Sequence, residues 1–150
     1  MSPDILFSTA NTAAVLGWLV LGYAVLRRND WLRDQLAGRW LPLAFAGFYS
    51  VLIFFFYGRG PGGFGSVGDV QALFTSPWMA LAGWVHYLAF DLFIGALIAR
   101  RVMAAGLPRF VLLVLLPATF LFGPVGLLLS EITLLALRPR ALAAPEEWLQ

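Results

Sequence analysis

Three ionisable side chains lie inside long apolar runs of this sequence: His86 and Asp91 in one run, and Glu131 near the end of another. Such groups are costly in apolar surroundings, so each is a candidate functional residue. An imidazole and a carboxyl group exchange protons readily, and the chemistry they offer is acid–base chemistry. If the run is a helix, His86 and Asp91 lie about 140° apart around its axis and about 7.5 Å apart along it. They therefore flank a common face of that helix.

The two faces of this helix differ in composition. Four residues fall between His86 and Asp91 around the helix: Gly83, Tyr87, Phe90 and Ile94. Seven aliphatic residues fall on the opposite side: Leu81, Val85, Leu88, Ala89, Leu92, Ala96 and Ala99. We predict that the first face points inward and lines a pocket, and that the aliphatic face contacts lipid. Tyr87 precedes Asp91 by four residues, a spacing at which its hydroxyl can reach the carboxylate.

Other roles for these ionisable residues remain open. His86 and Asp91 could hydrogen-bond neighbouring helices, for example through Asn11, Thr12 or Ser50, and so hold the helices together. Axial ligation of a haem or chlorophyll by His86 alone is a further alternative. We expect no metal site, because one histidine and two carboxylates on different helices are few ligands. A proton or ion channel is disfavoured because three ionisable groups form no evident chain.

The composition shows which elements must position these residues. The 150-residue chain is 61% hydrophobic and 12% charged, against about 25% charged residues in soluble domains, so the bilayer is the expected solvent. Four apolar stretches are long enough to span it: about 5–26, 41–57, 78–99 and 110–137. The fourth contains Pro117 and Pro124, which predict a kinked or broken helix. We therefore predict a single all-α domain over residues 1–150, a bundle of four transmembrane helices with a proline-kinked fourth helix.

The arginines predict how the bundle is oriented. The first and third loops contain Arg27, Arg28, Arg33, Arg39, Arg100, Arg101 and Arg109, and the other side contains Arg59, Arg138 and Arg140. Cytoplasmic loops are rich in Lys and Arg. Loops one and three are therefore predicted to be cytoplasmic, with both termini on the opposite side.

Several classes of protein are excluded by what the sequence lacks. It has no cysteine and no lysine, so disulfides and Schiff-base chemistry, including a covalently bound retinal, are ruled out. Residues 58–68 match G-x-G-x-x-G twice, but a membrane span precedes them where a nucleotide-binding fold needs a strand. We interpret this segment as a loop outside the membrane, followed by a short amphipathic helix at about 67–75. A net charge of +2 spread over loops does not indicate nucleic-acid binding.

Two motifs resemble the abscisic-acid-deficient-four-like family. The first is W-x-H-x-x-x-x-D-L-F, formed here by Trp84, His86, Asp91, Leu92 and Phe93, and the second is a later P-V-G turn at 124–126. They cover about residues 73–128. Plant members of this family are plastid membrane proteins required to make neoxanthin from violaxanthin. The chain begins at its apolar run without a Ser- and Arg-rich transit segment, so we expect a bacterial inner-membrane protein.

The resemblance implies a carotenoid isomerase that needs no cofactor. Converting an epoxide end group into an allenic alcohol requires one base and one acid, and His86 and Asp91 are our candidate catalytic pair. Gly83 would leave room for the substrate, while aromatic rings pack along the polyene. The candidate binding residues are Asn11, Gly83, Trp84, Tyr87, Phe90, Ile94, Pro124 and Glu131. The alternative is a non-catalytic carotenoid-binding protein or accessory subunit of a pigment–protein complex, and a homo-oligomer is compatible with either role.

Overall fold

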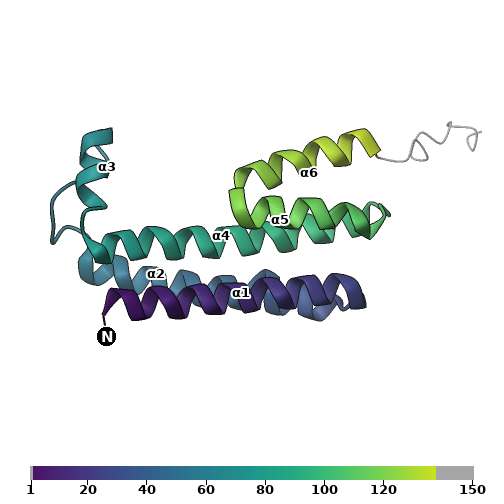
Figure 1. Ribbon diagram of the computed structural model, residues 1–150, viewed down its shortest axis with the longest axis horizontal. Helices are drawn as coiled ribbons and strands as arrows, with labels where there is room; N and C mark the ends of the chain where they lie inside the picture. The colour runs from purple at the N-terminus through teal and green to yellow at the C-terminus, as the bar shows by residue number, and fades with distance from the viewer. Residues whose placement is uncertain (1, 138–150) are drawn as a thin grey trace, which may run out of the picture.

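The computed structural model describes residues 2–137, and its elements within that range are all helical. Three helices are long and apolar enough to cross a membrane: α1 (Pro3–Arg27), the continuous helix Leu32–Phe56, and α4 (Pro77–Ala104). The continuous helix consists of the π-helix η1 (Leu32–Trp40) and α2 (Leu41–Phe56). Figure 1 shows α1, α2 and α4 running side by side along the long axis. The chain is therefore an integral membrane protein by the length and apolarity of its helices.

The second spanning helix begins earlier than the predicted boundary at 41. Its first turn contains charged residues, and these pair with one another. The Arg33 guanidinium contacts Asp30 Oδ1 and Asp34 Oδ2, each at 2.7 Å. Asn29 Oδ1 accepts a hydrogen bond from the Leu32 amide at 2.9 Å and so caps the helix start. Because the charges neutralise one another locally, the helix continues through this segment into the membrane.

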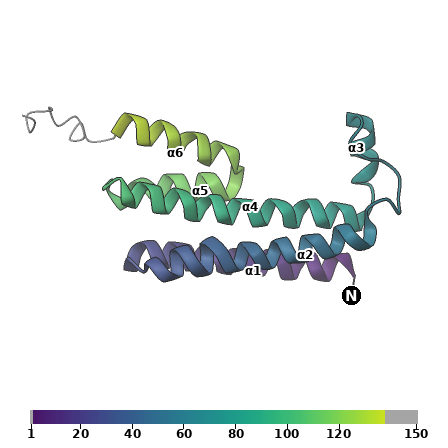
Figure 2. The same ribbon diagram turned by 180° about the vertical axis from the view of Figure 1, so that it is seen from behind.

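The predicted fourth span is instead a hairpin of two short helices. After the 3₁₀ turn η2 (Arg109–Val111), α5 (Leu112–Phe122) ends at Gly123 and α6 (Pro124–Leu137) begins. At 1.5 Å per residue, α5 and α6 are about 17 and 21 Å long, shorter than the roughly 30 Å hydrocarbon core. Figures 1 and 2 show α6 running back beside α5, with the turn against the middle of α4.

The two prolines of this segment have different effects, which explains why the chain forms a hairpin here and not a single kinked helix. Pro117 lies within α5, which continues past it. Gly123 has a φ of +37°, a backbone conformation that glycine tolerates better than other residues, and Pro124 follows at the first position of α6, where its missing N–H is harmless. The chain therefore reverses at residues 123–124, and a proline-kinked fourth span is not what the structure contains.

The reversal also changes which ends of the chain lie together. Leu137, the last described residue, lies at the end of the molecule that carries loops one and three, not at the end where α1 begins. The end of α6 and the start of α1 therefore lie at opposite ends of the molecule, and the C-terminus, which the sequence predicts on the same side as the N-terminus, lies outside the described residues. Arg138 and Arg140, counted above on the opposite side, lie outside the described residues. Among the described arginines, Arg59 alone belongs to the loop at the other end.

The central helix α4 buries its aliphatic face, which reverses the predicted orientation of that helix. The buried residues include all seven of the predicted lipid-facing set: Leu81, Val85, Leu88, Ala89, Leu92, Ala96 and Ala99. Small residues on this face allow close approach: a Cβ placed on Gly38 of η1 would lie 3.1 Å from Ala96 Cβ. Lipid is as apolar as a protein core, so hydrophobicity does not decide which face of a membrane helix is buried. Helix contacts in membranes favour small residues instead.

The glycine-rich loop at 58–66 leads into α3 (Val67–Leu73), which stands across the N-terminal end of α4 in Figure 1. Ser66 caps this helix by accepting a hydrogen bond from the Asp69 amide at 3.1 Å. The short helix predicted at about 67–75 is therefore present, and Leu73 anchors it by being buried.

Candidate functional site

Asp91 lies beneath the turn of the α5–α6 hairpin and is only 5% exposed. A Cβ placed on Gly123 would be 2.6 Å from Asp91 Oδ1, so the carboxyl group lies directly against the turn. Its other oxygen, Oδ2, has no hydrogen-bond partner among the described residues. Buried polar atoms are nearly always hydrogen-bonded, because an unpaired one costs free energy. The buried, unpaired oxygen therefore marks Asp91 as the candidate functional residue at this turn.

The Tyr87 hydroxyl satisfies a backbone carbonyl group at the same turn. In a regular helix the Phe120 carbonyl would accept a hydrogen bond from the amide of residue 124. Residue 124 is proline and has no N–H, and the Tyr87 hydroxyl donates to the Phe120 carbonyl oxygen instead, at 3.2 Å. The sequence predicted Asp91 as the partner of this hydroxyl, and Tyr87 does interact with the Asp91 carboxyl group. The hydroxyl also joins α4 to the last turn of α5.

An aromatic row leads from the N-terminal end of α1 to this turn; we define it as Phe7, Trp84, Tyr87, Phe120 and Trp18. The ring centroids of Phe7 and Trp84 are 5.5 Å apart, those of Trp84 and Tyr87 are 5.4 Å apart and stacked, and those of Trp18 and Phe120 are 5.4 Å apart. These distances are typical of favourable aromatic pairs. The row presents flat apolar surfaces beside the unpaired Asp91 oxygen.

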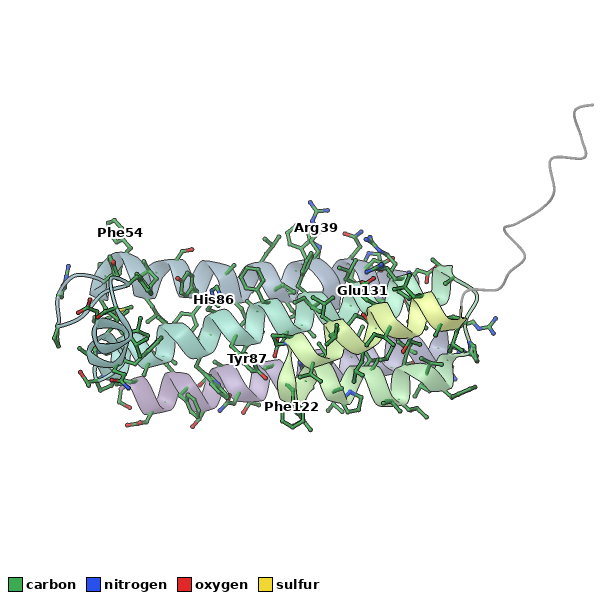
Figure 3. The ribbon with its side chains drawn as sticks, turned by 90° about the horizontal axis from the view of Figure 1, so that it is seen from above. Arg39, Phe54, His86, Tyr87, Phe122 and Glu131 are labelled. Atoms are coloured by element: carbon green, nitrogen blue, oxygen red, sulfur yellow. The ribbon has the colours of Figure 1, made fainter. Side chains whose placement is uncertain are left out.

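Asn11 fixes the orientation of one ring in the aromatic row. The Trp84 indole N–H donates to Asn11 Oδ1 at 2.6 Å, which joins α1 to α4. Both residues belong to the predicted binding set, and the structure brings them together with Tyr87. Figure 3 shows Tyr87 on the flank of α4 that faces α1.

His86 lies on the other flank of α4 and does not share a site with Asp91. Its ring centroid is 5.3 Å from that of Tyr49 on α2 and 4.7 Å from that of Phe90, and the side chain is exposed. Figure 3 shows it on the side toward α2. The prediction that His86 and Asp91 border one internal pocket therefore fails: α4 is the central helix, so groups about 140° apart on it meet different neighbours.

An apolar groove of about 300 Å³ lies between α2 and α4 on the same side as His86. Phe90, which is 54% exposed, and Arg39 line it, and the Arg39 guanidinium lies 5.1 Å from the ring centroid of Trp40. Phe90 therefore belongs to this groove and not to the aromatic row. Ile94 is half-buried.

The prediction that Gly83 leaves room for a ligand is wrong. The Phe74 ring, at the end of α3, fills the space over it: a Cβ on Gly83 would lie 2.6 Å from Phe74 Cε1. Gly83 therefore allows α3 to pack on α4, and Phe74 closes that position to substrate.

Glu131 binds Arg101 and is not part of the Asp91 site. Arg101 Nη2 donates to Glu131 Oε2 at 3.0 Å, and Nη1 contacts Oε1 as well. This bidentate pair joins α6 to the C-terminal half of α4, with each side chain 40% exposed. Pro124 contributes by starting α6. Within residues 2–137, no three His, Asp, Glu or Cys side chains are grouped as metal ligands.

The sequence did not single out three residues of the site: Trp18, Phe120 and Gly123. The Gly123–Pro124 pair was the available signal, since glycine after a helix and proline at the next helix start are typical boundary residues. Trp18 and Phe120 had no sequence signal, because single aromatic residues in an apolar run are ordinary. Their role follows only from the packing of α5 against α1 and α4.

A comparison with known families identifies the chain. The family model described as ABA4-like, ABA DEFICIENT 4-like, matches residues 5–129, and the chain belongs to this family. No curated protein and no solved structure matches it. Membership of the family indicates a role in carotenoid- or xanthophyll-related membrane function.

Proposed function

We propose that the protein is a carotenoid isomerase that converts an epoxide end group into an allenic alcohol at the turn of the α5–α6 hairpin. The observation that carries the proposal is the buried Asp91 carboxyl group with its unpaired Oδ2. Family membership supports the choice of substrate class. The polyene lies along the aromatic row, with its end group under the turn.

The reaction needs proton transfer and no redox partner. Asp91, in its acid form, gives its proton to the epoxide oxygen as the bond between that oxygen and the ring carbon next to the polyene breaks. The adjacent polyene carbon then loses a proton to the other carboxyl oxygen, and its C–H electron pair forms the second double bond of the allene. Substrate and product have the same atoms, and the carboxyl group regains its proton. One carboxyl group, whose two oxygens act in turn as acid and as base, therefore completes the cycle.

The aromatic row supports the charged intermediate. Opening the epoxide leaves positive charge spread over the polyene, and aromatic faces attract cations. Tyr87 and Trp84 stack on each other beside the last turn of α5. His86 lies on the other flank of α4 and takes no part in this mechanism.

Pigment analysis of host membranes that supply an epoxy-carotenoid tests the proposal. The wild-type protein should form a carotenoid of unchanged mass and changed chromatographic mobility. Asp91→Asn should abolish conversion, because an amide has no proton of comparable acidity to give, while pigment still co-purifies. The matched control is Asp69→Asn on α3, which should convert normally.

A non-catalytic carotenoid-binding protein is the competing function, favoured by the aromatic row, which needs no proton transfer to hold a polyene. It predicts that unchanged pigment co-purifies equally with the wild type and with Asp91→Asn, and that no new carotenoid forms in either. Conversion that persists in Asp91→Asn would instead disprove the role given to this residue.

A further inference from the structure

A polar pocket of about 530 Å³ lies at the end of the molecule that carries loops one and three. Arg28, which follows α1, and Arg109, which starts η2, both line it, and no acidic residue does. Among the described residues, the ion pairs are made by Arg33 and Arg101, so neither Arg28 nor Arg109 has a carboxylate partner there. Two guanidinium groups in one pocket without acidic neighbours favour a doubly contacted anion.

The backbone holds both arginines in place. Arg109 Nη1 donates to the carbonyl oxygens of Val25 and Leu26 at 3.2 and 2.9 Å, which fixes this side chain at the last turn of α1. Arg28 has a φ of +55° and is the one non-glycine residue with positive φ among those described. Glycine is the usual residue at such a helix end. An arginine at a position where its backbone is strained indicates that its side chain is needed there.

An apolar groove continues from this pocket along α1 and α5. Its first part, about 430 Å³, shares Arg109 with the pocket, and its second part, about 360 Å³, shares Gly22, Leu113 and Leu116 with the first and ends at Phe120. From Arg109 to Phe120 is about 16 Å at helical rise, roughly half of the 30 Å hydrocarbon core. The groove therefore has the depth of one lipid leaflet.

Gly22 gives the groove its width. A Cβ added there would meet no atom within 4 Å, so no protein group occupies the space in front of it. The groove and the pocket together offer a cationic head site joined to an apolar channel.

We propose that this site binds one anionic phospholipid, with its phosphate on Arg28 and Arg109 and one acyl chain in the groove between α1 and α5. The chemistry matches at both ends: the guanidinium pair complements a phosphate, and the channel accommodates a hydrocarbon chain. The far end of the groove meets the aromatic row at Trp18 and Phe120, whereas the arginine pocket lies at the opposite end of the groove. Lipid binding there does not depend on the proposed isomerase activity.

Thermal unfolding of the purified protein in a neutral detergent tests this proposal, with phosphatidylglycerol, phosphatidylcholine and inorganic phosphate as separate additions. Phosphatidylglycerol should raise Tm in a saturable way at concentrations at which the other two have no effect. An equal response to phosphatidylcholine would overturn the proposal, because the arginines would then play no part. A response to inorganic phosphate alone would show a free-anion site and would also overturn it.

Two variants locate the lipid. Arg28→Gln should weaken the phosphatidylglycerol response at least tenfold in midpoint concentration, whereas Arg27→Gln, its neighbour outside the pocket lining, should leave it unchanged. Gly22→Leu should fill the groove and weaken the response without lowering the Tm of the lipid-free protein, since the added side chain meets open space. Equal effects of Arg27→Gln and Arg28→Gln, or an unchanged response in Gly22→Leu, would disprove the site.

Discussion

Asp91 and Tyr87 acquire their environment from a backbone break created by Gly123 and Pro124. Proline removes the donor that the Phe120 carbonyl would have used, and glycine permits the reversal of the chain. Tyr87 satisfies the freed carbonyl, and the absence of a Cβ at Gly123 lets the Asp91 carboxyl group lie against the turn. Two residues of α4 thus depend on two residues of the hairpin.

Gly123→Ala should destabilise the protein by about 1–3 kcal/mol, because alanine is strained at positive φ and its Cβ would lie 2.6 Å from Asp91 Oδ1. Reversible unfolding in mixed detergent micelles measures this change. Gly47→Ala is the control: Gly47 lies in α2 with a normal φ, and its Cβ would meet nothing within 4 Å. If the two variants are equally stable, the close approach of Asp91 to the turn is wrong.

Tyr87→Phe should cost about 0.6–2 kcal/mol by removing an interhelical hydrogen bond. The same substitution made together with Pro124→Ala should cost less, because alanine restores an amide that can bond the Phe120 carbonyl. A double-mutant cycle on unfolding free energies measures this coupling. Additive effects would mean that the Tyr87 hydroxyl does not replace the donor missing at Pro124.

At the scale of the elements, the α5–α6 hairpin is attached to α4 at two levels. The turn contacts Asp91 and Tyr87, and the Arg101–Glu131 pair attaches α6 nearer the loop-three end. Neither short helix spans the membrane by itself, so their positions depend on these contacts and on packing. The ion pair is partly exposed, and such pairs contribute at most about 1 kcal/mol.

Glu131→Gln should therefore lower overall stability only slightly but loosen α6 from α4. Hydrogen–deuterium exchange should increase over 124–137 and stay unchanged over α1. The charge-reversed double variant Arg101→Glu with Glu131→Arg should recover most of the protection. Arg100→Gln, next to the pair but outside it, serves as the control. Unchanged exchange in Glu131→Gln would show that the pair does not hold α6.

At the scale of the whole molecule, three spanning helices and a half-depth hairpin place Leu137 at the same end as loops one and three. Seven of the eight arginines among the described residues belong to loops one and three or lie near their ends, and Arg59 belongs to the loop at the opposite end. The positive-inside rule then assigns the arginine-rich end to the cytoplasm. We therefore predict that the end of α6 lies on the cytoplasmic side.

Single cysteines test this topology cleanly, because the chain has none of its own. Asn29→Cys and Leu137→Cys should react with a membrane-impermeant maleimide from the same side of sealed vesicles. Gly60→Cys in the glycine-rich loop should react from the other side. Labelling of Leu137→Cys together with Gly60→Cys would restore a fourth membrane span and reject the hairpin.

The sequence by itself determined the solvent, the helical class and three of the membrane-spanning segments. These are local properties: about 20 apolar residues suffice to define a span, and backbone groups inside lipid require a helix. It also singled out Asp91, Tyr87, Trp84 and Asn11, because polar and aromatic residues are conspicuous in apolar runs. The family resemblance, carried by short motifs, was confirmed over residues 5–129.

Only the tertiary structure decided which face of α4 is buried and which groups share a site. Lipid and protein core are equally apolar, so hydrophobicity along the helix could not assign its faces, and the aliphatic side proved to be the core. His86 and Asp91 lie in different environments because α4 has neighbouring helices on both flanks. Whether Gly123 and Pro124 kink a span or reverse the chain depended on contacts with Asp91 and Tyr87, residues more than 30 positions away, which no local pattern contains.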